Sequence, residues 1–514
     1  MLLATSASAA TADLYLYLDQ GVYNPIDPGG PVTYRYYAAN TGPETVEARL
    51  IQPLPPGAHF VAVSHPDWTC SEGAGEVVCR RTLKPPTDYY DAFVSITISA
   101  PEDPAGGRFS WTTRLESDAD DPTPLTNRVE PVTLVVYHAL MVTTPDDFGD
   151  GSLRAIIERA NVECDATLPC KVRFAGPMRI APRAPLPAIT ACDLLIDGGA
   201  RGSFDVARTV EISGAEAGSG SGFRIESQCR ANGRGGAVEL RALAINSFRD
   251  NGVDVGEPMD TAITVSGCFI GTDPAGTIAL PNGLRGISAD ARKAEVHVYG
   301  SLIAGNARSG VALWNVEFGD LAANLIGIRY GGAPLPNGAS GVYINGGFLR
   351  LSSNTIEYNR DFGVAVGPGA GRVVSEHDYI HENGGLAIDW GLDGPTSIEA
   401  SGRMPPVPRL IDAFYDPATR RTTVRGVIPA GAFPAGFHSV RAYIGGADAP
   451  DFGGGLEARS QAAFVPASGK ETAFEIVIAG DFRGARMTAL TLLYSFLDGP
   501  PVAASEYSAG ILVR

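Results

Sequence analysis

Lysine is scarce in this chain, and several motifs that would identify an enzyme are missing. Only four of the 514 residues are lysine, and the formal net charge is −17. A surface this acidic repels phosphate backbones and anionic lipid headgroups, so nucleic acid is not an expected partner. The sequence has no phosphate-binding glycine loop, no nucleophile elbow and no zinc motif. It also has no apolar run of about 18 residues, so no membrane span is expected.

Glycine and proline are abundant instead, and their placement predicts an all-β protein. The 62 glycines and 38 prolines lie between runs rich in β-branched residues. This pattern is typical of many short strands joined by turns. The chain is too long for a single hydrophobic core, so about three domains are expected. They are placed at residues 13–138, 139–396 and 397–514, after a leader at residues 1–12.

The N-terminal leader predicts export. Residues 1–12 are rich in alanine and serine, and Ala7-Ser8-Ala9 fits the small-x-small cleavage site of a secretory signal peptide. The basic region of such a signal is missing, so a plain alanine and serine leader is the alternative. With a cleaved signal, the protein would be a secreted or cell-surface bacterial protein.

The seven cysteines support export, because two pairs are close enough in sequence to close small disulfide loops. The two pairs are Cys70 with Cys79 and Cys164 with Cys170. Neither pair has the spacing of a zinc site with nearby histidines. Cys192 and Cys229 could also pair with each other, which leaves Cys268 as a small buried residue.

Residues 13–138 predict an N-terminal β-sandwich, because short strand-like runs alternate with turns. The expected strands cover residues 14–18, 32–39, 59–64, 93–99, 109–115 and 132–136. The turn Asn40-Thr41-Gly42-Pro43, the step Leu54-Pro55-Pro56-Gly57 and the end Trp68-Thr69-Cys70 resemble the bacterial Ig-like conserved-repeat domain of cell-surface proteins. The resemblance implies a spacer or adhesive module and not a catalyst.

The central residues 139–396 repeat, which predicts a right-handed parallel β-helix with three sides. Each repeat has an isoleucine, a polar turn, a glycine and an apolar-x-apolar strand. One isoleucine is expected in the same place of each coil: Ile245, Ile270, Ile303, Ile326, Ile356 and Ile380. Asn306, Asn359 and Asn383 each follow their isoleucine by three residues, and can form a hydrogen-bonded ladder at one corner. A β-propeller, the alternative fold, would need longer four-stranded repeats.

A helix is expected at the start of this region. Ser152 can cap it, and an apolar stripe follows on one side of it, formed by Leu153, Ile156, Ile157 and Ala160. Such a helix can cover the open end of a stacked sheet. The phrases GSLRAIIERAN, LPAITACDLLIDGG, FIGTDPAG and GLAIDWGLDGP resemble secreted bacterial pectate-lyase-like β-helix proteins. After residue 397 the periodicity stops, and alternating strands predict a small C-terminal β-sandwich.

One outward face of the β-helix is a candidate ligand site. The strands expected to stack begin at Val253, Ile287, Val311, Val342, Val364 and Leu386. With strands about 4.8 Å apart, Trp314 lies beside Tyr343, and Asp254, Asp290 and Asn345 lie around them. Aromatic faces next to short polar side chains suit sugar rings. The alternative is that Trp314 packs under a loop.

A second group of residues is a candidate for acid–base chemistry. Glu357 and His381 each follow a stacked isoleucine, so they are expected one coil apart, with Asp361 near them in sequence. A carboxylate and an imidazole in contact could serve as acid and base. Polysaccharide lyases of the resembled family combine calcium-binding carboxylates with an arginine or lysine base, for which Arg308 and Arg360 are the candidates. The alternative is a surface ion pair.

Calcium is the one cofactor considered. Asp146, Asp147 and Asp150 could bind it, but they lack the spacing of a known calcium loop, so a solvated turn and no cofactor are expected.

Two functions remain open. The first is a non-enzymatic secreted or surface protein that adheres to a polysaccharide or cell-surface glycan. The second is a polysaccharide lyase or glycoside hydrolase that acts on the β-helix face. New reducing ends or unsaturated uronate would distinguish the second from the first.

Overall fold

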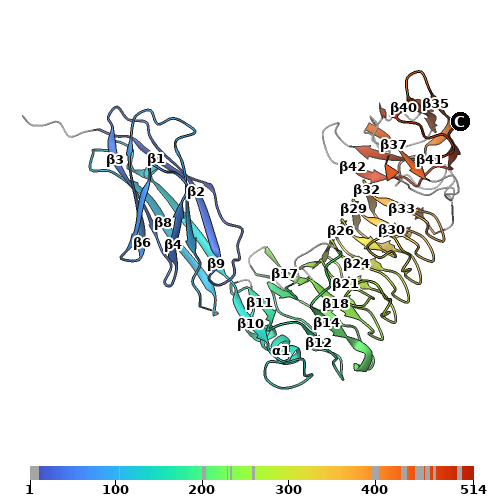
Figure 1. Ribbon diagram of the computed structural model, residues 1–514, viewed down its shortest axis with the longest axis horizontal. Coiled ribbons are helices and arrows are strands. Elements are labelled where there is room, and N and C mark those ends of the chain that lie inside the picture. Colours follow the sequence, from blue (N-terminus) through green and yellow to red (C-terminus); the bar gives the residue numbers. More distant parts are fainter. Residues whose placement is uncertain are drawn as a thin grey trace, which may run out of the picture. The chain divides into compact units, whose positions relative to one another are not determined.

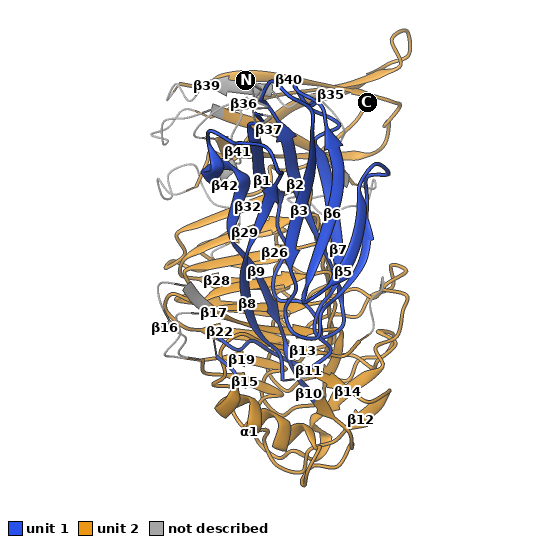
Figure 2. Ribbon diagram, turned by 90° about the vertical axis from the view of Figure 1, so that its left-hand side faces the viewer, with its two compact units in different colours: residues 1–140, 164–171 blue, residues 141–163, 172–514 orange. Residues whose placement is uncertain are grey.

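A computed structural model describes residues 11–103, 105–165, 167–199, 204–227, 230–231, 234–256, 261–392, 394, 404–429, 437–445, 456–457, 463–466, 470–494 and 501–514. The predicted cleavage site and Cys229 lie outside these residues. The chain divides into two compact units, residues 1–140 with 164–171 and residues 141–163 with 172–514 (Figure 2). The predicted domain limits at residues 138 and 396 stay predictions.

The first unit contains two antiparallel sheets, as predicted for a β-sandwich. One sheet has the order β1 (Leu14–Gln20), β2 (Pro31–Asn40), β7 (Phe93–Ser99) and β4 (His59–Val63). The other has the order β5 (Thr69–Gly73), β6 (Glu76–Leu83), β3 (Val46–Pro53), β8 (Gly107–Glu116) and β9 (Arg128–Val136). Every second residue of β7 is buried, and the two sheets share one hydrophobic core. A short 3-10 turn, Pro124–Asn127, precedes β9.

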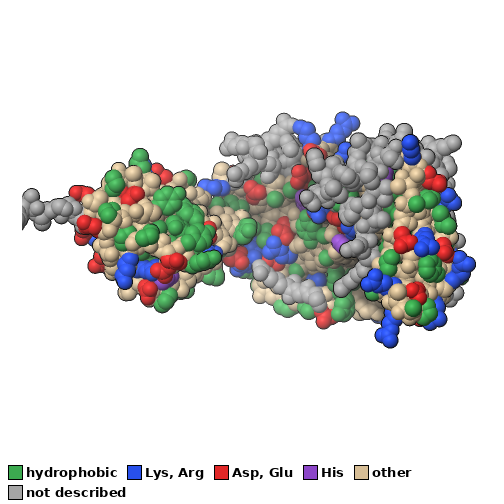
Figure 3. Space-filling model, turned by 90° about the horizontal axis from the view of Figure 1, so that it is seen from above, with side chains coloured by type: hydrophobic (Ala, Val, Ile, Leu, Met, Phe, Trp, Pro, Cys, Tyr) green, Lys and Arg blue, Asp and Glu red, His purple; other side chains and the backbone are tan. Residues whose placement is uncertain are grey.

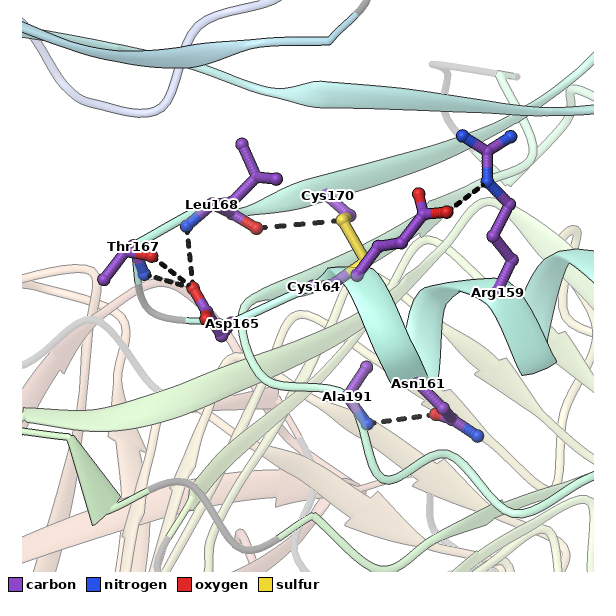
Figure 4. The surroundings of a disulfide bond; sticks show 9 residues. Arg159, Asn161, Cys164, Asp165, Thr167, Leu168, Cys170 and Ala191 are labelled. Atoms are coloured by element: carbon purple, nitrogen blue, oxygen red, sulfur yellow. Dashed lines mark hydrogen bonds and ion pairs between the residues drawn. A yellow bond between two sulfur atoms is a disulfide. The ribbon is translucent and has the colours of Figure 1, made fainter.

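Both predicted disulfides are present. Cys70 and Cys79 face each other across the β5–β6 hairpin, and Cys164 is bonded to Cys170 (Figure 4). In the loop of the second disulfide, Asp165 accepts hydrogen bonds from the backbone of residues 167 and 168. Cys192 is also disulfide-bonded. Cys268 is a buried free thiol, as expected.

Three long, mainly parallel sheets form the predicted β-helix (Figure 1). Sheet I has the order β10 (His138–Val142), β11 (Cys170–Phe174), β13 (Leu194–Asp197), β17 (Arg234–Arg241), β20 (Thr261–Ser266), β23 (Glu295–Tyr299), β26 (Phe318–Ala322), β29 (Phe348–Ser352) and β32 (Arg372–Glu376), and β16 (Arg230–Ala231) pairs with β17. Sheet II has the order β12 (Met178–Ile180), β14 (Val210–Ser213), β18 (Leu243–Asn246), β21 (Phe269–Ile270), β24 (Leu302–Ile303), β27 (Leu325–Ile326), β30 (Thr355–Glu357) and β33 (Tyr379–His381). Sheet III has the order β15 (Phe223–Ile225), β19 (Val253–Val255), β22 (Ile287–Asp290), β25 (Val311–Trp314), β28 (Val342–Asn345), β31 (Val364–Val366) and β34 (Ile388–Trp390). A 3-10 turn, Gly214–Glu216, follows β14.

The predicted stacking of the isoleucines is confirmed in sheet II. Ile245 pairs with Ile270, and the same column continues one strand at a time to Ile380. Each isoleucine of this column is fully buried. The hydrophobic period of the sequence therefore fixed the register of this sheet correctly, since a shifted strand would turn these side chains outward.

The predicted asparagine ladder is present and longer than expected. The side-chain amide of each member donates to the side-chain oxygen of the next at 2.9–3.0 Å, in the order Asn282, Asn306, Asn337, Asn359 and Asn383. Asn282 and Asn337 come from the two proline-asparagine-glycine loops. All five side chains are buried, so these contacts satisfy polar groups that water does not reach.

A second ladder, not predicted, follows another corner. Ser301 donates its backbone N–H to Asn324, and the Asn324 amide donates to Asn354 at 2.9 Å. The Asn354 amide and backbone N–H both donate to Oδ1 of Asp378 at 2.8 Å. Ser375 donates its hydroxyl to the other oxygen of Asp378 at 2.7 Å. The second ladder therefore ends on a buried carboxyl group.

The β-helix is covered at both ends. The predicted helix α1 (Leu153–Glu163) lies beside β10, β11 and β12, and its predicted apolar stripe is buried (Figures 1 and 2). Ser152 accepts a hydrogen bond from the Ala155 N–H, as expected of a cap. At the other end, the N–H of Trp390 donates to the buried carboxylate of Glu506 at 2.9 Å, and β42 (Pro501–Ala504) lies beside β32.

The C-terminal residues form two antiparallel sheets. One has the order β35 (Arg409–Asp416), β36 (Arg421–Ile428) and β40 (Thr472–Ala479). The other has the order β38 (Leu456–Glu457), β37 (Phe437–Gly445), β41 (Arg486–Tyr494) and β42, with β39 (Ala463–Pro466) on β37 and β43 (Ile511–Leu512) on β41. The predicted all-β class is thus confirmed, with a parallel β-helix between antiparallel, sandwich-like sheets. No helix in the described ranges is long and apolar enough to cross a membrane.

Candidate functional site

The outward face of sheet III brings together four of the five predicted ligand-binding residues. Asp290 pairs with Trp314, and Trp314 pairs with Asn345 on the next coil. Tyr343 lies two residues before Asn345 on the same strand, so its ring points to the same side of the sheet. The rings of Trp314 and Tyr343 are in contact, with centroids 5.3 Å apart and planes tilted by 44°. Both side chains are half-buried.

An arginine that the sequence did not single out covers part of this pair. The guanidinium of Arg285, in the turn before β22, lies 4.4 Å from the centroid of a Trp314 ring. Burial and the nearby Arg308 lower the pKa of Arg285. Arg308 is exposed and makes no ion pair within the described ranges. The Arg285 side chain therefore covers part of Trp314. Its guanidinium places a positive charge next to the ring pair.

The polar side chains near the two rings are held by hydrogen bonds. Asp290 accepts a hydrogen bond from the Asn315 amide at 2.7 Å. Asn345 accepts one from the Gly369 N–H at 2.7 Å, which fixes the amide and leaves its NH₂ group to donate outward. Asp254, the fifth predicted residue, lies two strands away on β19 and accepts from Asn251 at 2.9 Å. Burial raises the pKa of Asp254, and this residue is not part of the ring pair.

One predicted register was wrong. The last strand of sheet III stacks Ile388, and not Leu386, on Val364, so Asp389 lies under Ala365. Each ladder asparagine precedes the first inward residue of its sheet III strand by five positions, from Asn282 and Ile287 to Asn383 and Ile388. Counting from the asparagines would have given the correct register.

The predicted acid–base pair is in contact. Glu357 and His381 are register partners on β30 and β33, and Nε2 of the histidine lies 2.8 Å from Oε1 of the glutamate, although not aligned as a hydrogen bond. Their side chains are only 6% and 17% exposed, and the Tyr379 ring lies 4.0 Å from the imidazole. Asp361 is exposed, and its side chain makes no hydrogen bond or ion pair within the described ranges. The third predicted member is therefore not assembled with the pair.

Sheet I carries a polar cluster that the sequence reading missed. Tyr299 donates its hydroxyl to Asp320 at 2.9 Å and lies 3.0 Å from Nδ1 of His297. Burial, with Asp320 beside it, raises the pKa of Tyr299 to about 12. The Phe318 ring lies next to His297, and the Phe348 ring lies next to Phe318 on the same face. The signal was available, because these residues alternate with buried valines and leucines in β23, β26 and β29.

The three aspartates considered for calcium do not act as one group. Asp147 is nearly buried and binds the guanidinium of Arg154 at 2.7 Å, whereas Asp146 accepts a hydrogen bond from the Thr144 hydroxyl. Asp150 is exposed. The pairing of Asp147 with Arg154 already neutralises that carboxylate, so this turn offers a cation fewer free charges than the sequence suggested.

The similarity of this chain to known proteins is weak. No protein-family profile matches the chain, and no curated protein sequence matches it. Among solved structures, it is similar to the full-length tailspike protein 2 of the Escherichia coli O157:H7 bacteriophage CAB120, at 10% sequence identity and a TM-score of 0.20. The match covers 64% of this chain and 60% of the tailspike chain, so it spans less than two thirds of that protein.

Proposed function

We propose that this chain is an exported, secreted or cell-surface bacterial protein that binds a polysaccharide or cell-surface glycan on the outward face of sheet III, without cleaving it. The contact between Trp314 and Tyr343 carries the proposal. Two joined rings offer an apolar surface for a sugar ring, and Asp290 and Asn345 at their edge can orient its hydroxyls. Arg285 and Arg308 beside the rings favour an acidic glycan over a neutral one.

Two further observations support this proposal. The disulfides Cys70–Cys79 and Cys164–Cys170 are typical of proteins in oxidising compartments. The N-terminal sandwich resembles Ig-like surface modules in sequence, which suits a spacer or adhesive role. Glycan binding by a rigid β-helix face, held away from the cell by such a module, would serve adhesion.

A glycan array of acidic and neutral polysaccharides, probed with the full chain, tests the proposal. Trp314→Ala should weaken binding by about 1–3 kcal/mol, by analogy with stacking of bases on aromatic side chains. Its matched control is Tyr330→Ala, which removes another aromatic side chain of the same unit that is 54% exposed. Glu357→Gln should leave binding unchanged. A wild-type chain that binds no glycan, or a Trp314→Ala chain that binds as well, would show that Trp314 serves only in packing.

A polysaccharide lyase or glycoside hydrolase is the second candidate function. The observation that favours it is the 2.8 Å contact between Glu357 and His381, which could exchange a proton with a substrate. Assays for new reducing ends and for unsaturated uronate, on acidic and neutral polysaccharides, test it. Turnover that is abolished by Glu357→Gln, with binding retained, would establish this function in place of the first.

A further inference from the structure

Six aromatic side chains form one continuous cluster on the outside of the first sheet of the N-terminal unit. This tyrosine patch consists of Tyr15, Tyr17, Tyr37, Tyr89, Tyr90 and Phe93. Its centre is a row of rings on three adjacent strands, in which Tyr17 stacks on Tyr37 at 4.9 Å and Tyr37 meets Phe93 at 5.3 Å. In Figure 3, hydrophobic side chains gather on the face of this unit that is turned to the viewer.

The strand register explains why these rings lie together and why they lie outside. Tyr17, Tyr37 and Phe93 are direct cross-strand partners. Their sequence neighbours Leu16 and Tyr36 point inward and are buried in the core of the sandwich. The outward face of an antiparallel sheet is usually polar, so the core does not account for six aromatic side chains here. Tyr15, Tyr89 and Tyr90 are 42%, 57% and 85% exposed.

The chemistry of the patch is amphipathic. Five of its six rings end in a hydroxyl group. Arg35 and Asp19 at its edge form an ion pair at 3.3 Å, and the Arg35 guanidinium lies 4.2 Å from the Phe93 ring centroid. The exposed carboxylate of Asp88 accepts the Tyr90 N–H at 3.0 Å and has no ion pair among the described residues. The hydroxyls of Thr33 and Thr97, 2.8 Å apart, continue the same face, so the patch offers apolar area and hydrogen-bonding groups beside one unpaired negative charge.

We propose that the tyrosine patch is a second carbohydrate-binding site, which takes a neutral polysaccharide. Ring faces can stack on the apolar faces of the sugars, while the tyrosine and threonine hydroxyls and the Asp19–Arg35 pair bind their hydroxyl groups. The unpaired carboxylate of Asp88 repels an acidic polymer, in contrast to the arginine-flanked rings of sheet III, so the proposed ligand is an uncharged polymer. All residues of this proposed site belong to the N-terminal unit, so the inference does not depend on the function proposed for the β-helix.

Calorimetric titration of the full chain with three neutral oligosaccharides, cellohexaose, chitohexaose and mannohexaose, tests this inference. The wild type should bind at least one of them. The double substitution Tyr89→Ala and Tyr90→Ala should weaken that binding about tenfold, as expected from two aromatic contacts. The matched control is Tyr23→Ala, because Tyr23 is 90% exposed and lies outside the patch. Both this variant and Trp314→Ala should bind the same oligosaccharide as the wild type does.

Four results would overturn the inference. The first is no binding of any of the three oligosaccharides by the wild type. The second is equal binding by the double variant, with circular dichroism showing an intact fold. The third is a wild-type dimer, measured by light scattering, that the double variant loses, because the patch would then bind a second copy of the chain. Loss of binding in Trp314→Ala alone would assign the neutral sugar to sheet III instead.

Discussion

Replacing the buried carboxyl group at the end of the second ladder should make the β-helix more stable at alkaline pH. Asp378 is buried and accepts hydrogen bonds from Asn354 and Ser375. In Asp378→Asn, the new amide oxygen can accept the same two bonds from Asn354. Its NH₂ group can donate to the Ser375 hydroxyl, which can turn to accept. The substitution therefore removes an ionisable group and retains the bonds from Asn354, while the weak contact of the carboxyl group with the Glu376 N–H is lost.

The size and sign of the effect follow from the pKa. Burial raises the pKa of Asp378 from 3.8 to about 7, so the folded chain holds this proton more tightly than the unfolded chain does. The stability that this carboxyl group contributes is complete below about pH 4 and is lost as the pH rises through about 7. A shift of about three pKa units corresponds to roughly 4 kcal/mol at most. Asp378→Asn should match the wild type near pH 4 and exceed it above pH 7.

Urea denaturation followed by far-ultraviolet circular dichroism, at several values between pH 4.5 and 8.5, measures this difference. The matched control is Asp361→Asn, which changes an exposed carboxylate in another turn and should give the same curve as the wild type at every pH. A difference between Asp378→Asn and the wild type that does not change with pH would refute the reasoning. It would mean that the buried carboxyl group has an ordinary pKa, or that its burial costs nothing.

Three other substitutions or measurements test the fold. Ile303→Asp should prevent folding, because Ile303 is fully buried and an unpaired charge there costs several kcal/mol or more; a soluble, protease-resistant variant would contradict the register of sheet II. Asn337→Ala should destabilise the chain by about 3 kcal/mol in urea denaturation, because it leaves buried groups of the first ladder without partners; an unchanged free energy of unfolding would contradict the ladder. Mass spectrometry of non-reduced peptides should find Cys70 bonded to Cys79, and free thiols at both would contradict the structure.

Sheet II could be predicted from the sequence because one residue type repeats in it. The isoleucine column from Ile245 to Ile380 is inside, and a single apolar type at a fixed place in each coil shows the register without a structure. The first ladder could be predicted for the same reason, since its members are all asparagines. The candidate ring pair on sheet III followed from that register, and Trp314 and Tyr343 do meet.

The features that were missed have mixed residue types. The second ladder contains serine, asparagine and aspartate, so no single letter repeats along it. The cluster of His297, Tyr299 and Asp320 lies on sheet I, where the outward positions change from coil to coil. Arg285 was missed because it comes from a turn, and the position of a turn side chain depends on loop geometry that hydrophobic periodicity does not encode.

The covering of the C-terminal end of the β-helix has a consequence for assembly. A parallel β-helix ends in strands with unpaired backbone groups. Here the last strands are β32, β33 and β34, whose free backbone N–H and C=O groups could pair with a further coil. Here β42 and the Glu506 carboxylate, which binds the N–H of Trp390, occupy part of that end. A chain that stopped after residue 392 would expose the backbone groups of these strands that β42 and Glu506 now cover. The C-terminal residues therefore give these backbone groups partners within the chain, where an open edge would favour pairing with another molecule.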